Sequence, residues 1–205
     1  MVRISPPPNQ ASGIITPPQP HMPKAECEAL TAALQQAQSY LEFGMGGSTL
    51  LAAWLSVPQI IAIDSSQAWV DKVAGQISEI QTASQVTLLF ANIGPTGDWG
   101  YPEDMKTQCR WPDYYALPWA TAAEPDLVLI DGRFRVPCFL YSLLRLKPGA
   151  VILWDDYAQR AEYHLVEQHL APSVFFGDMA KFIVPSHVNT ANILNNLFEN
   201  LYLAN

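Results

Sequence analysis

The stretch that decides the fold of this 205-residue chain is YLEFGMGGSTLLAAW, residues 40–54. Its apolar start, ending at Phe43, predicts a buried strand, and the residues from Thr49 to Leu55 predict a helix. Glycines between the two allow the backbone to turn tightly and to approach a ligand where a Cβ would collide. Such a loop is typical of a site for a nucleotide-like molecule, although similar glycine-rich turns also serve packing alone.

The same alternation of short apolar runs and helical patterns continues on both sides of this loop. Helical periodicity is predicted over residues 24–38, 49–55, 66–80 and 136–146, and buried strands over residues 39–43, 59–63, 86–90, 126–130 and 150–154. Strands that are separated by helices form right-handed crossovers. The pattern therefore predicts a parallel sheet that is covered on both faces.

The C-terminal part predicts how this sheet ends. A helix is expected over residues 157–170, and SVFFGDMAKFIV, residues 173–184, has two β-rich runs on either side of Gly177 and Asp178. Because glycine can adopt the positive φ of a tight turn, these runs predict an antiparallel hairpin, followed by a last helix over residues 191–203. The predicted fold class is α/β, with a doubly wound, mostly parallel seven-stranded sheet and an antiparallel C-terminal hairpin.

The chain is predicted to form a single domain. Residues 1–23 contain seven prolines and are expected to form a Pro-rich N-terminal arm, because proline lacks a backbone donor. Residues 24–205 form the domain, with an aromatic-rich insertion over about 92–125. Loops of this length are usually functional, so the insertion is either a substrate lid or a folded flap whose aromatics pack on the core or on another subunit.

Composition limits the possible partners and the compartment. A formal charge of −8 argues against a nucleic-acid or anionic-membrane surface, because the long-range field would repel both. Three widely spaced cysteines without a CxxC pair suggest reduced thiols, and no signal peptide or membrane span is apparent. We therefore expect a cytoplasmic protein that acts on a small-molecule substrate; a homo-oligomer is compatible with the composition.

Two acidic residues narrow the ligand of the glycine loop. Asp64 ends the second predicted strand twenty residues after Gly44, the spacing at which an acid accepts the ribose hydroxyls of an adenosine; it could also cap the next helix. Glu42 would repel a pyrophosphate, and Thr49 stands where a dinucleotide loop has its third glycine. S-adenosylmethionine carries an ammonium and a sulfonium and no phosphate, so this acid favours it over NAD.

At these residues the sequence resembles the class I S-adenosylmethionine-dependent methyltransferases. Their first motif is an acid, any residue and a glycine-x-glycine loop, followed by an acid that ends the second strand. The resemblance spans about residues 24–185, includes IDGRFR and WDDY at later strand ends, and departs at Ser48, where many members have a further glycine. It implies a Rossmann-like methyltransferase fold and, with the residues after the third strand holding adenine, the cofactor-binding residues Glu42, Gly44, Met45, Gly46, Gly47, Ser48, Asp64, Ser65, Asn92 and Ile93.

Charged residues at the ends of the fourth and fifth strands are the candidate catalytic groups. They are Asp131, Arg133, Arg135, Asp155 and Asp156. The carboxylates could bind Mg²⁺, as in the catechol-type O-methyltransferases that this stretch partly resembles, or one of Asp131 and Asp155 could act as general base. The neighbouring arginines disfavour a metal, since they could neutralise the same carboxylates, and they could instead bind an anionic substrate.

The sequence thus predicts methyl transfer from S-adenosylmethionine to a small-molecule acceptor, which could be anionic. A non-catalytic binding or assembly module with the same fold is the alternative, because fold does not fix function. An NAD-dependent oxidoreductase is disfavoured by Glu42, Thr49 and the terminal hairpin.

Overall fold

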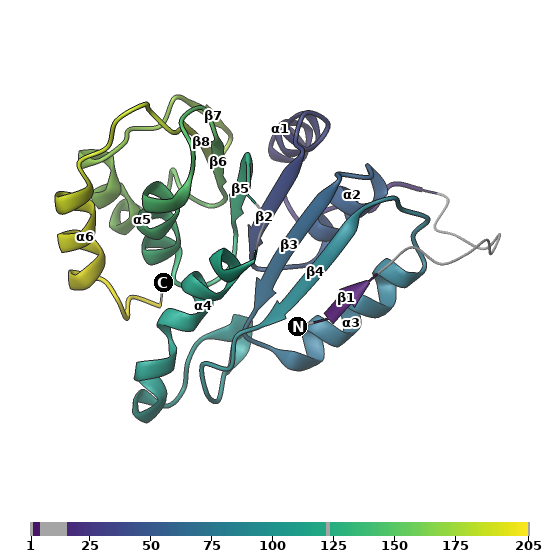
Figure 1. Ribbon diagram of the computed structural model, residues 1–205, viewed down its shortest axis with the longest axis horizontal. Helices are drawn as coiled ribbons and strands as arrows, with labels where there is room; N and C mark the ends of the chain where they lie inside the picture. Colours follow the sequence, from purple (N-terminus) through teal and green to yellow (C-terminus); the bar gives the residue numbers. More distant parts are fainter. Residues whose placement is uncertain (1, 5–15, 122–123, 205) are drawn as a thin grey trace.

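The computed structural model of the chain describes residues 2–4, 16–121 and 124–204. Residues 5–15 of the predicted arm and residues 122–123 of the aromatic-rich insertion lie outside the described residues. The described part is an α/β fold around one mixed sheet (Figure 1).

The sheet contains all seven predicted strands and one more. Its order is β1-β4-β3-β2-β5-β6-β8-β7, in which β2 to β6 are parallel and β7 and β8 form the predicted antiparallel hairpin. The added strand, β1, pairs antiparallel with β4 at the edge of the sheet and comes from the start of the Pro-rich arm. The strands are β1 (Val2–Ile4), β2 (Ser39–Phe43), β3 (Gln59–Asp64), β4 (Gln85–Phe90), β5 (Leu127–Ile130), β6 (Val151–Trp154), β7 (Val174–Phe176) and β8 (Met179–Ile183).

Alternating side chains of the strands build two cores, one on each face of the sheet. In β2, Tyr40 contributes to one core and Leu41 and Phe43 to the other, as expected for side chains that alternate along a strand. The first core packs against α1 (Lys24–Leu34), α2 (Gly47–Trp54) and α3 (Gln67–Ser78). The second packs against α4 (Pro112–Ala116), α5 (Arg135–Arg145) and α6 (Thr190–Glu199), so the sheet is covered on both faces (Figure 1).

The strand order reverses at β2. Chain order runs outward from β2 through β3 to β4 in one direction and from β5 to β6 in the other. In sheets of this kind, ligands bind at the carboxyl ends of the strands at such a reversal. The fold therefore predicts a ligand site among the loops that follow β2, β3, β5 and β6.

The predicted helix over residues 157–170 is wrong. The backbone turns at Asp156, which has a positive φ of 58°, and the backbone N–H groups of Tyr157 and Ala158 donate to Asp178 O at 2.8 and 3.0 Å. These bonds tie the segment to the β7–β8 turn, so that only a 3-10 helix, Ala161–Gln168, follows.

The aromatic-rich insertion is folded. It contains α4 and three 3-10 helices, Asp98–Gly100, Met105–Arg110 and Leu117–Ala120. Four of its aromatic side chains are buried in the second core: Trp111, Tyr114, Tyr115 and Trp119. Trp99 and Tyr101 are exposed by 86% and 44%. The packed-flap interpretation therefore describes most of the segment, and only these two aromatics are available to a ligand or partner.

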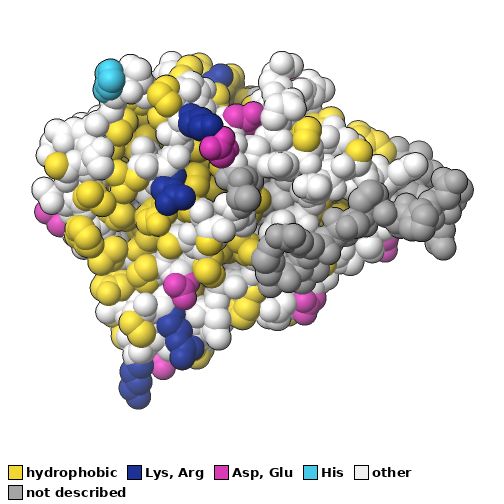
Figure 2. Space-filling view, viewed as in Figure 1, with side chains coloured by type: hydrophobic (Ala, Val, Ile, Leu, Met, Phe, Trp, Pro, Cys, Tyr) yellow, Lys and Arg dark blue, Asp and Glu magenta, His cyan; other side chains and the backbone are white. Residues whose placement is uncertain are grey.

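Two properties concern the surface. Figure 2 shows hydrophobic side chains gathered over the half of this face that α4, α5 and α6 form in Figure 1; exposed apolar residues of this half include Leu117, Leu194, Phe198 and Tyr202. Among the described residues, no helix is both long and apolar enough to cross a membrane.

Candidate functional site

Backbone hydrogen bonds continue past the strands and hold their carboxyl ends in line. Ala91 N donates to Asp64 O at 2.9 Å and Gly44 N to Ile63 O at 3.0 Å, which joins the ends of β4, β3 and β2. Asp131 N donates to Phe43 O at 2.9 Å and Asp155 N to Ile130 O at 3.0 Å. The fold therefore places the loop after β2 between Asp64 on one side and the carboxylates after β5 and β6 on the other.

Gly44 makes the turn out of β2. It has a φ of 93°, a conformation that glycine adopts at little cost. A Cβ at Gly44 would lie 2.9 Å from Gly132 N, because the backbones that leave β2 and β5 are in direct contact. Gly132 is equally constrained, since a Cβ there would lie 2.8 Å from Gly44 N. This pair of glycines explains the close approach of the two loops.

Glu42 fixes the glycine loop through hydrogen bonds to its side chain. Its side chain is buried, it accepts a hydrogen bond from the Ser48 hydroxyl, and it accepts another at 2.7 Å from Thr49 Oγ1. Thr49 Oγ1 in turn accepts from Gly46 N at 2.9 Å, which accounts for a threonine where a dinucleotide loop has glycine. Burial raises the pKa of Glu42 to about 8, against the lowering effect of both hydroxyls. A cation nearby would favour its ionised form.

The middle of the glycine loop contacts the side chain of Trp69, which was not among the predicted site residues. Trp69 Nε1 donates to Met45 O. A Cβ at Gly46 would meet only Trp69 Cζ2 at 3.8 Å, and Gly46 has an extended φ of 168°. The backbone conformation of Gly46 thus accepts any residue, and the free space beside it is the feature that suits a ligand. One exposed tryptophan in a helix carries no signal in a single sequence.

Gly47 is covered by the arm. A Cβ there would lie 2.8 Å from Pro20 Cα and 2.9 Å from Gln19 O. The part of the arm that precedes α1 therefore packs on the start of α2. Gly47 serves this contact in the structure and does not line open space.

Asp64 ends β3 as predicted, with its side chain partly exposed. Its Oδ1 accepts from Ser66 N at 2.8 Å. The N-cap of α3 is Ser66, whose hydroxyl accepts from Trp69 N, so the interpretation of Asp64 as the helix cap is wrong. Burial raises the pKa of Asp64 to about 6, against hydrogen bonds from the backbone of Ser66, Ser65 and Met45 and the charge of Arg133. Asp64 is thus mostly ionised at neutral pH and available to hydroxyl donors.

The residues expected to hold adenine differ in exposure. Asn92 is exposed, and its side chain accepts from Gly94 N at 3.3 Å. Ile93 is fully buried in the second core. Ser65 is also buried, and a Cβ at Gly100 would lie 2.9 Å from its hydroxyl, so the segment after β4 lies over the end of β3.

Two carboxylates and backbone carbonyl groups that follow β5 and β6 gather around Arg135. Arg135 Nη2 lies 3.2 Å from Asp131 Oδ1 and 3.6 Å from Asp156 Oδ2. Arg135 also donates from Nε to Gly132 O at 2.9 Å and from Nη1 to Asp155 O. Asp156 has a second cation, since Arg160 Nη2 lies 2.7 Å from its Oδ2. Arg135 is therefore a buried side chain whose hydrogen bonds and ion pairs join the carboxyl ends of β5 and β6.

Asp131 and Asp155 form a coupled pair of carboxyl groups. Burial, together with the negative charges of Asp131, Asp156 and Glu26, raises the pKa of Asp155 to about 8. Burial also raises the pKa of Asp131, against the charge of Arg135. Burial and the neighbouring negative charges thus favour the protonated form of these two acids, which is a property of residues that handle protons.

Metal binding finds little support at this cluster. In residues 2–4, 16–121 and 124–204, no group of three or more His, Cys, Asp or Glu side chains is arranged to hold a metal ion. The Arg135 guanidinium lies between Asp131 and Asp156, where a cation would otherwise sit.

Arg133 and Arg135 do not point the same way, contrary to the alternation expected after a strand. Phe134, between them, has a left-handed φ of 55° and a fully buried side chain. This turn sends Arg135 to the carboxylates and Arg133 toward Tyr101, whose ring centroid lies 4.2 Å from the Arg133 Cζ. Non-glycine residues with positive φ are uncommon and concentrate at functional sites.

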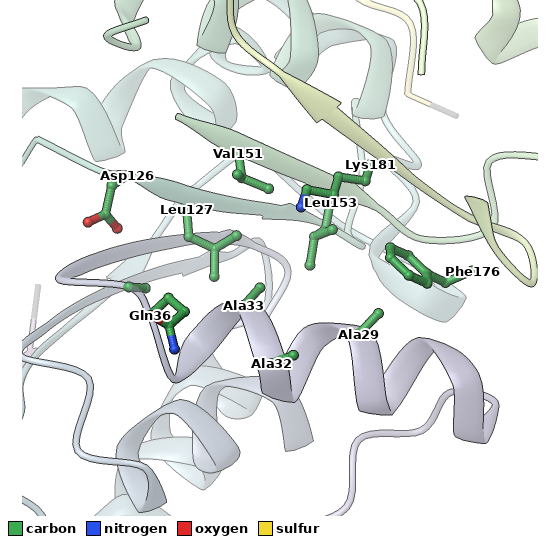
Figure 3. A pocket seen from close by; sticks show the side chains of 11 residues that line it. Ala29, Ala32, Ala33, Gln36, Asp126, Leu127, Val151, Leu153, Phe176 and Lys181 are labelled. Atoms are coloured by element: carbon green, nitrogen blue, oxygen red, sulfur yellow. The ribbon is translucent and has the colours of Figure 1, made fainter. Parts of the chain in front are cut away.

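A separate cavity lies away from these strand ends. Its volume is about 410 Å³. It lies between one side of α1 and the sheet and is lined by alanines of α1, by Leu127 and Val151 at the starts of β5 and β6, and by Leu153 (Figure 3). Because β5 and β6 begin here, this hollow lies near the opposite end of these strands from Asp131 and Asp155. It is therefore not the crevice that the glycine loop would line.

Comparison with known proteins agrees with the fold. No protein-family model matches the chain, and no curated protein matches its sequence. Among solved structures, a methyltransferase-like protein from Silicibacter pomeroyi DSS-3 is 35% identical with a TM-score of 0.84, and the match covers 91% of this chain and 98% of that chain.

Two more distant structures share the fold. An RNA methyltransferase from Salinibacter ruber, solved with S-adenosyl-L-homocysteine, has a TM-score of 0.50 at 15% identity over 81% of this chain and 94% of its own. A tRNA m1G37 methyltransferase from M. jannaschii has a TM-score of 0.51 at 9% identity over 82% of this chain and 52% of its own. With 35% identity over nearly its whole length to the S. pomeroyi protein, the chain belongs to the methyltransferase-like proteins of the class I S-adenosylmethionine-dependent methyltransferase superfamily.

Proposed function

We propose that this protein binds S-adenosylmethionine at the carboxyl ends of β2 and β3 and transfers its methyl group to a small-molecule acceptor. The observation that carries the proposal is the meeting of three features at the reversal of strand order. They are the glycine loop held by Glu42, the partly exposed acid Asp64, and the two acids Asp131 and Asp155, whose pKa values are raised by burial.

The residues present fit the cofactor in charge and shape. The free space beside Gly46 would be filled by a Cβ, and Asp64 is placed to accept hydroxyl hydrogen bonds. Burial raises the pKa of Glu42 to about 8, and a sulfonium bound at the loop would favour its ionised form, whereas a pyrophosphate would not. When bound, S-adenosylmethionine supplies an electrophilic methyl group on sulfur.

The chain's own contribution to the reaction is alignment and proton handling. Asp155 Oδ1 is buried and, among the described residues, has no hydrogen-bond partner, whereas a third of the Asp131 side chain is exposed. The pair can therefore take up a proton that a hydroxyl or amine acceptor releases as its oxygen or nitrogen attacks. Oxygen is weakly preferred over nitrogen as the nucleophile, and the acidic surface favours a small molecule over nucleic acid or membrane.

The second candidate is a binding module without methyl transfer. It is favoured by the covering of the loop, since Gln19 and Pro20 lie on Gly47 and Gly100 lies on Ser65. Gln19, Pro20 and Gly100 would have to move away from these residues for a ligand to enter the site.

Melting the protein with S-adenosylmethionine, S-adenosylhomocysteine and NAD in parallel tests the proposal. We expect the first two ligands to raise the melting temperature, because a ligand that binds only the native state stabilises it, and NAD to leave it unchanged. Transfer of labelled methyl groups to a metabolite mixture then separates the candidates. Binding with no transfer favours the binding module, and stabilisation by NAD alone rejects both.

A further inference from the structure

Arg133 is buried without the contacts that a buried guanidinium normally makes. It is only 8% exposed, yet within the described part of the chain its Nε and Nη1 have no hydrogen-bond partner. Arg135 provides the contrast: it is 3% exposed, and every nitrogen of its guanidinium donates to a carbonyl or carboxylate oxygen. Buried donors without an acceptor are unfavourable, and a buried charge is normally paired.

The surroundings of Arg133 place it in the proposed site. Its guanidinium stacks on the Tyr101 ring at 4.2 Å, and a Cβ at Gly100 would lie 3.7 Å from its Cγ and 2.9 Å from Ser65 Oγ. Residues 97–101 therefore cover both Arg133 and the end of β3. The charge of Arg133 also lowers the pKa of Asp64 and of Asp131, so it acts on an acid on either side of the glycine loop.

The covering segment carries an exposed tryptophan and closes on itself. Trp99 has a left-handed φ of 58° and is 86% exposed, so its large side chain contributes little burial. The segment is closed on itself by Gly97 N donating to Tyr101 O at 2.9 Å and by a bridge between Thr96 and Pro102. A unit closed in this way can move as a whole, and its removal would expose the Arg133 donors.

We propose that Arg133, covered by Tyr101 and residues 97–101, binds an anionic group of the ligand that enters this crevice. The inference rests on the proposed function, and it assigns the anion-binding role to Arg133 and not to Arg135. A carboxylate, phosphate or sulfate has the acceptor oxygens that the free N–H groups need, and guanidinium binds such groups well. Two sources offer this chemistry: the carboxylate of the cofactor's amino-acid part and an acidic substituent of the methyl acceptor.

The variant Arg133→Met separates binding from structure. Methionine keeps most of the side chain's volume against Tyr101 and removes the unpaired charge, so we expect a melting temperature equal to or above that of the parent. A structural arginine would instead give a clear fall. Arg145→Gln is the matched control, because Arg145 is exposed, contacts Trp119 and lies on the far end of α5.

Calorimetric titrations with two adenosine compounds and an inorganic anion identify the source. S-adenosylhomocysteine has the carboxylate, and 5′-methylthioadenosine lacks it. If the cofactor supplies the anion, Arg133→Met weakens S-adenosylhomocysteine binding by about tenfold or more and leaves 5′-methylthioadenosine unchanged. If the acceptor supplies it, both affinities stay as in the parent, and inorganic phosphate stabilises the complex of the parent but not that of the variant.

Two results would overturn the inference: unchanged behaviour of Arg133→Met toward all three probes, or a lower melting temperature with loss of both adenosine compounds together. Failure of the proposed function is distinguishable, because then the parent binds neither adenosine compound. In that case stabilisation of the parent by phosphate, absent in Arg133→Met, would still support the anion site, and equal response of the two proteins would reject it.

Discussion

Gly44 is the residue on which the loop geometry depends most. Its φ of 93° is unfavourable for any residue with a Cβ, and that Cβ would meet the backbone of Gly132 at 2.9 Å. We expect Gly44→Ala to lower the free energy of unfolding by about 2 kcal/mol or more, from backbone strain and overpacking together. Urea unfolding measures it.

Gly75→Ala is the matched control for this substitution. Gly75 lies within α3, is exposed, and has no atom within 4 Å of the Cβ position among the described residues. Alanine there should raise the free energy of unfolding by about 0.5–1 kcal/mol, because alanine favours a helix. Equal effects of the two alanines would show that the β2 turn is not constrained as described.

Glu42 makes stability depend on pH in a definite direction. Its folded pKa of about 8 lies above the ordinary 4.5, so the folded protein binds the extra proton. That stabilisation is fully present below about pH 4.5 and is lost as the pH rises through 8, by up to about 1.4 kcal/mol per pH unit for each proton. Asp155 acts in the same direction.

Replacing Glu42 by Gln tests this dependence. We expect Glu42→Gln to reduce the fall in unfolding free energy between about pH 5 and 8, while Glu28→Gln, at an exposed position of α1, leaves it as in the parent. Urea unfolding across this range provides the measurement. A pH dependence as steep in Glu42→Gln as in the parent would contradict the burial of an uncharged Glu42.

At the scale of single residues, the sequence shows which types of residue form the site, but not the directions in which their side chains point. Asp64 and Glu42 could be predicted as site residues because the sequence spacing of each acid from Gly44 indicates its role. The divergence of Arg133 and Arg135 could not, because it depends on the left-handed backbone of Phe134, whose ring packs against the distant residues Trp111 and Tyr114.

At the scale of elements, the ends of β5 and β6 are joined by one side chain. Arg135 donates to Gly132 O, Asp131 O and Asp155 O. Arg135→Gln should lower the free energy of unfolding by about 2–4 kcal/mol, since buried carbonyl and carboxylate groups lose their partner, whereas Arg145→Gln changes it by less than about 0.5 kcal/mol. Thermal and urea unfolding would show this. A stable Arg135→Gln protein that has lost anion binding would instead assign Arg135 to the ligand.

The same strand ends predict the response to divalent cations. Because Arg135 Nη2 already lies within 3.6 Å of carboxylate oxygens of Asp131 and Asp156, we expect millimolar Mg²⁺ or Ca²⁺ to leave the melting temperature of the ligand-free protein unchanged. A chelator-treated sample is the reference. A rise that disappears in Asp131→Asn would establish a metal site and favour metal-assisted O-methylation.

The buried strands were predictable to within one residue because parallel strands covered on both faces are continuous apolar runs. Three features were not. The edge strand β1 lies in a proline-rich arm, and its pairing with β4 is a long-range event. The 3-10 helix after β6 follows from bonds to Asp178, and the short helices of residues 92–121 are below the length at which periodicity is informative.

At the scale of the whole molecule, the charge of the chain limits its partners. The formal charge is −8. Phosphate backbones require a basic surface. A small-molecule acceptor therefore stays our proposal, and any anion it carries would need a local cation such as Arg133.

The central claim is that this chain binds the adenosine part of S-adenosylmethionine through Asp64. Calorimetric titration of S-adenosylhomocysteine into the parent, Asp64→Ala and Asp71→Ala tests it most directly; Asp71 is an exposed acid on α3, in contact with Gln67, and serves as the control. We predict binding to the parent and to Asp71→Ala with equal affinity, and a loss of about 1–3 kcal/mol for a folded Asp64→Ala, since ribose hydroxyls lose their acceptor. No binding to the parent, or equal affinity in Asp64→Ala, would contradict the account.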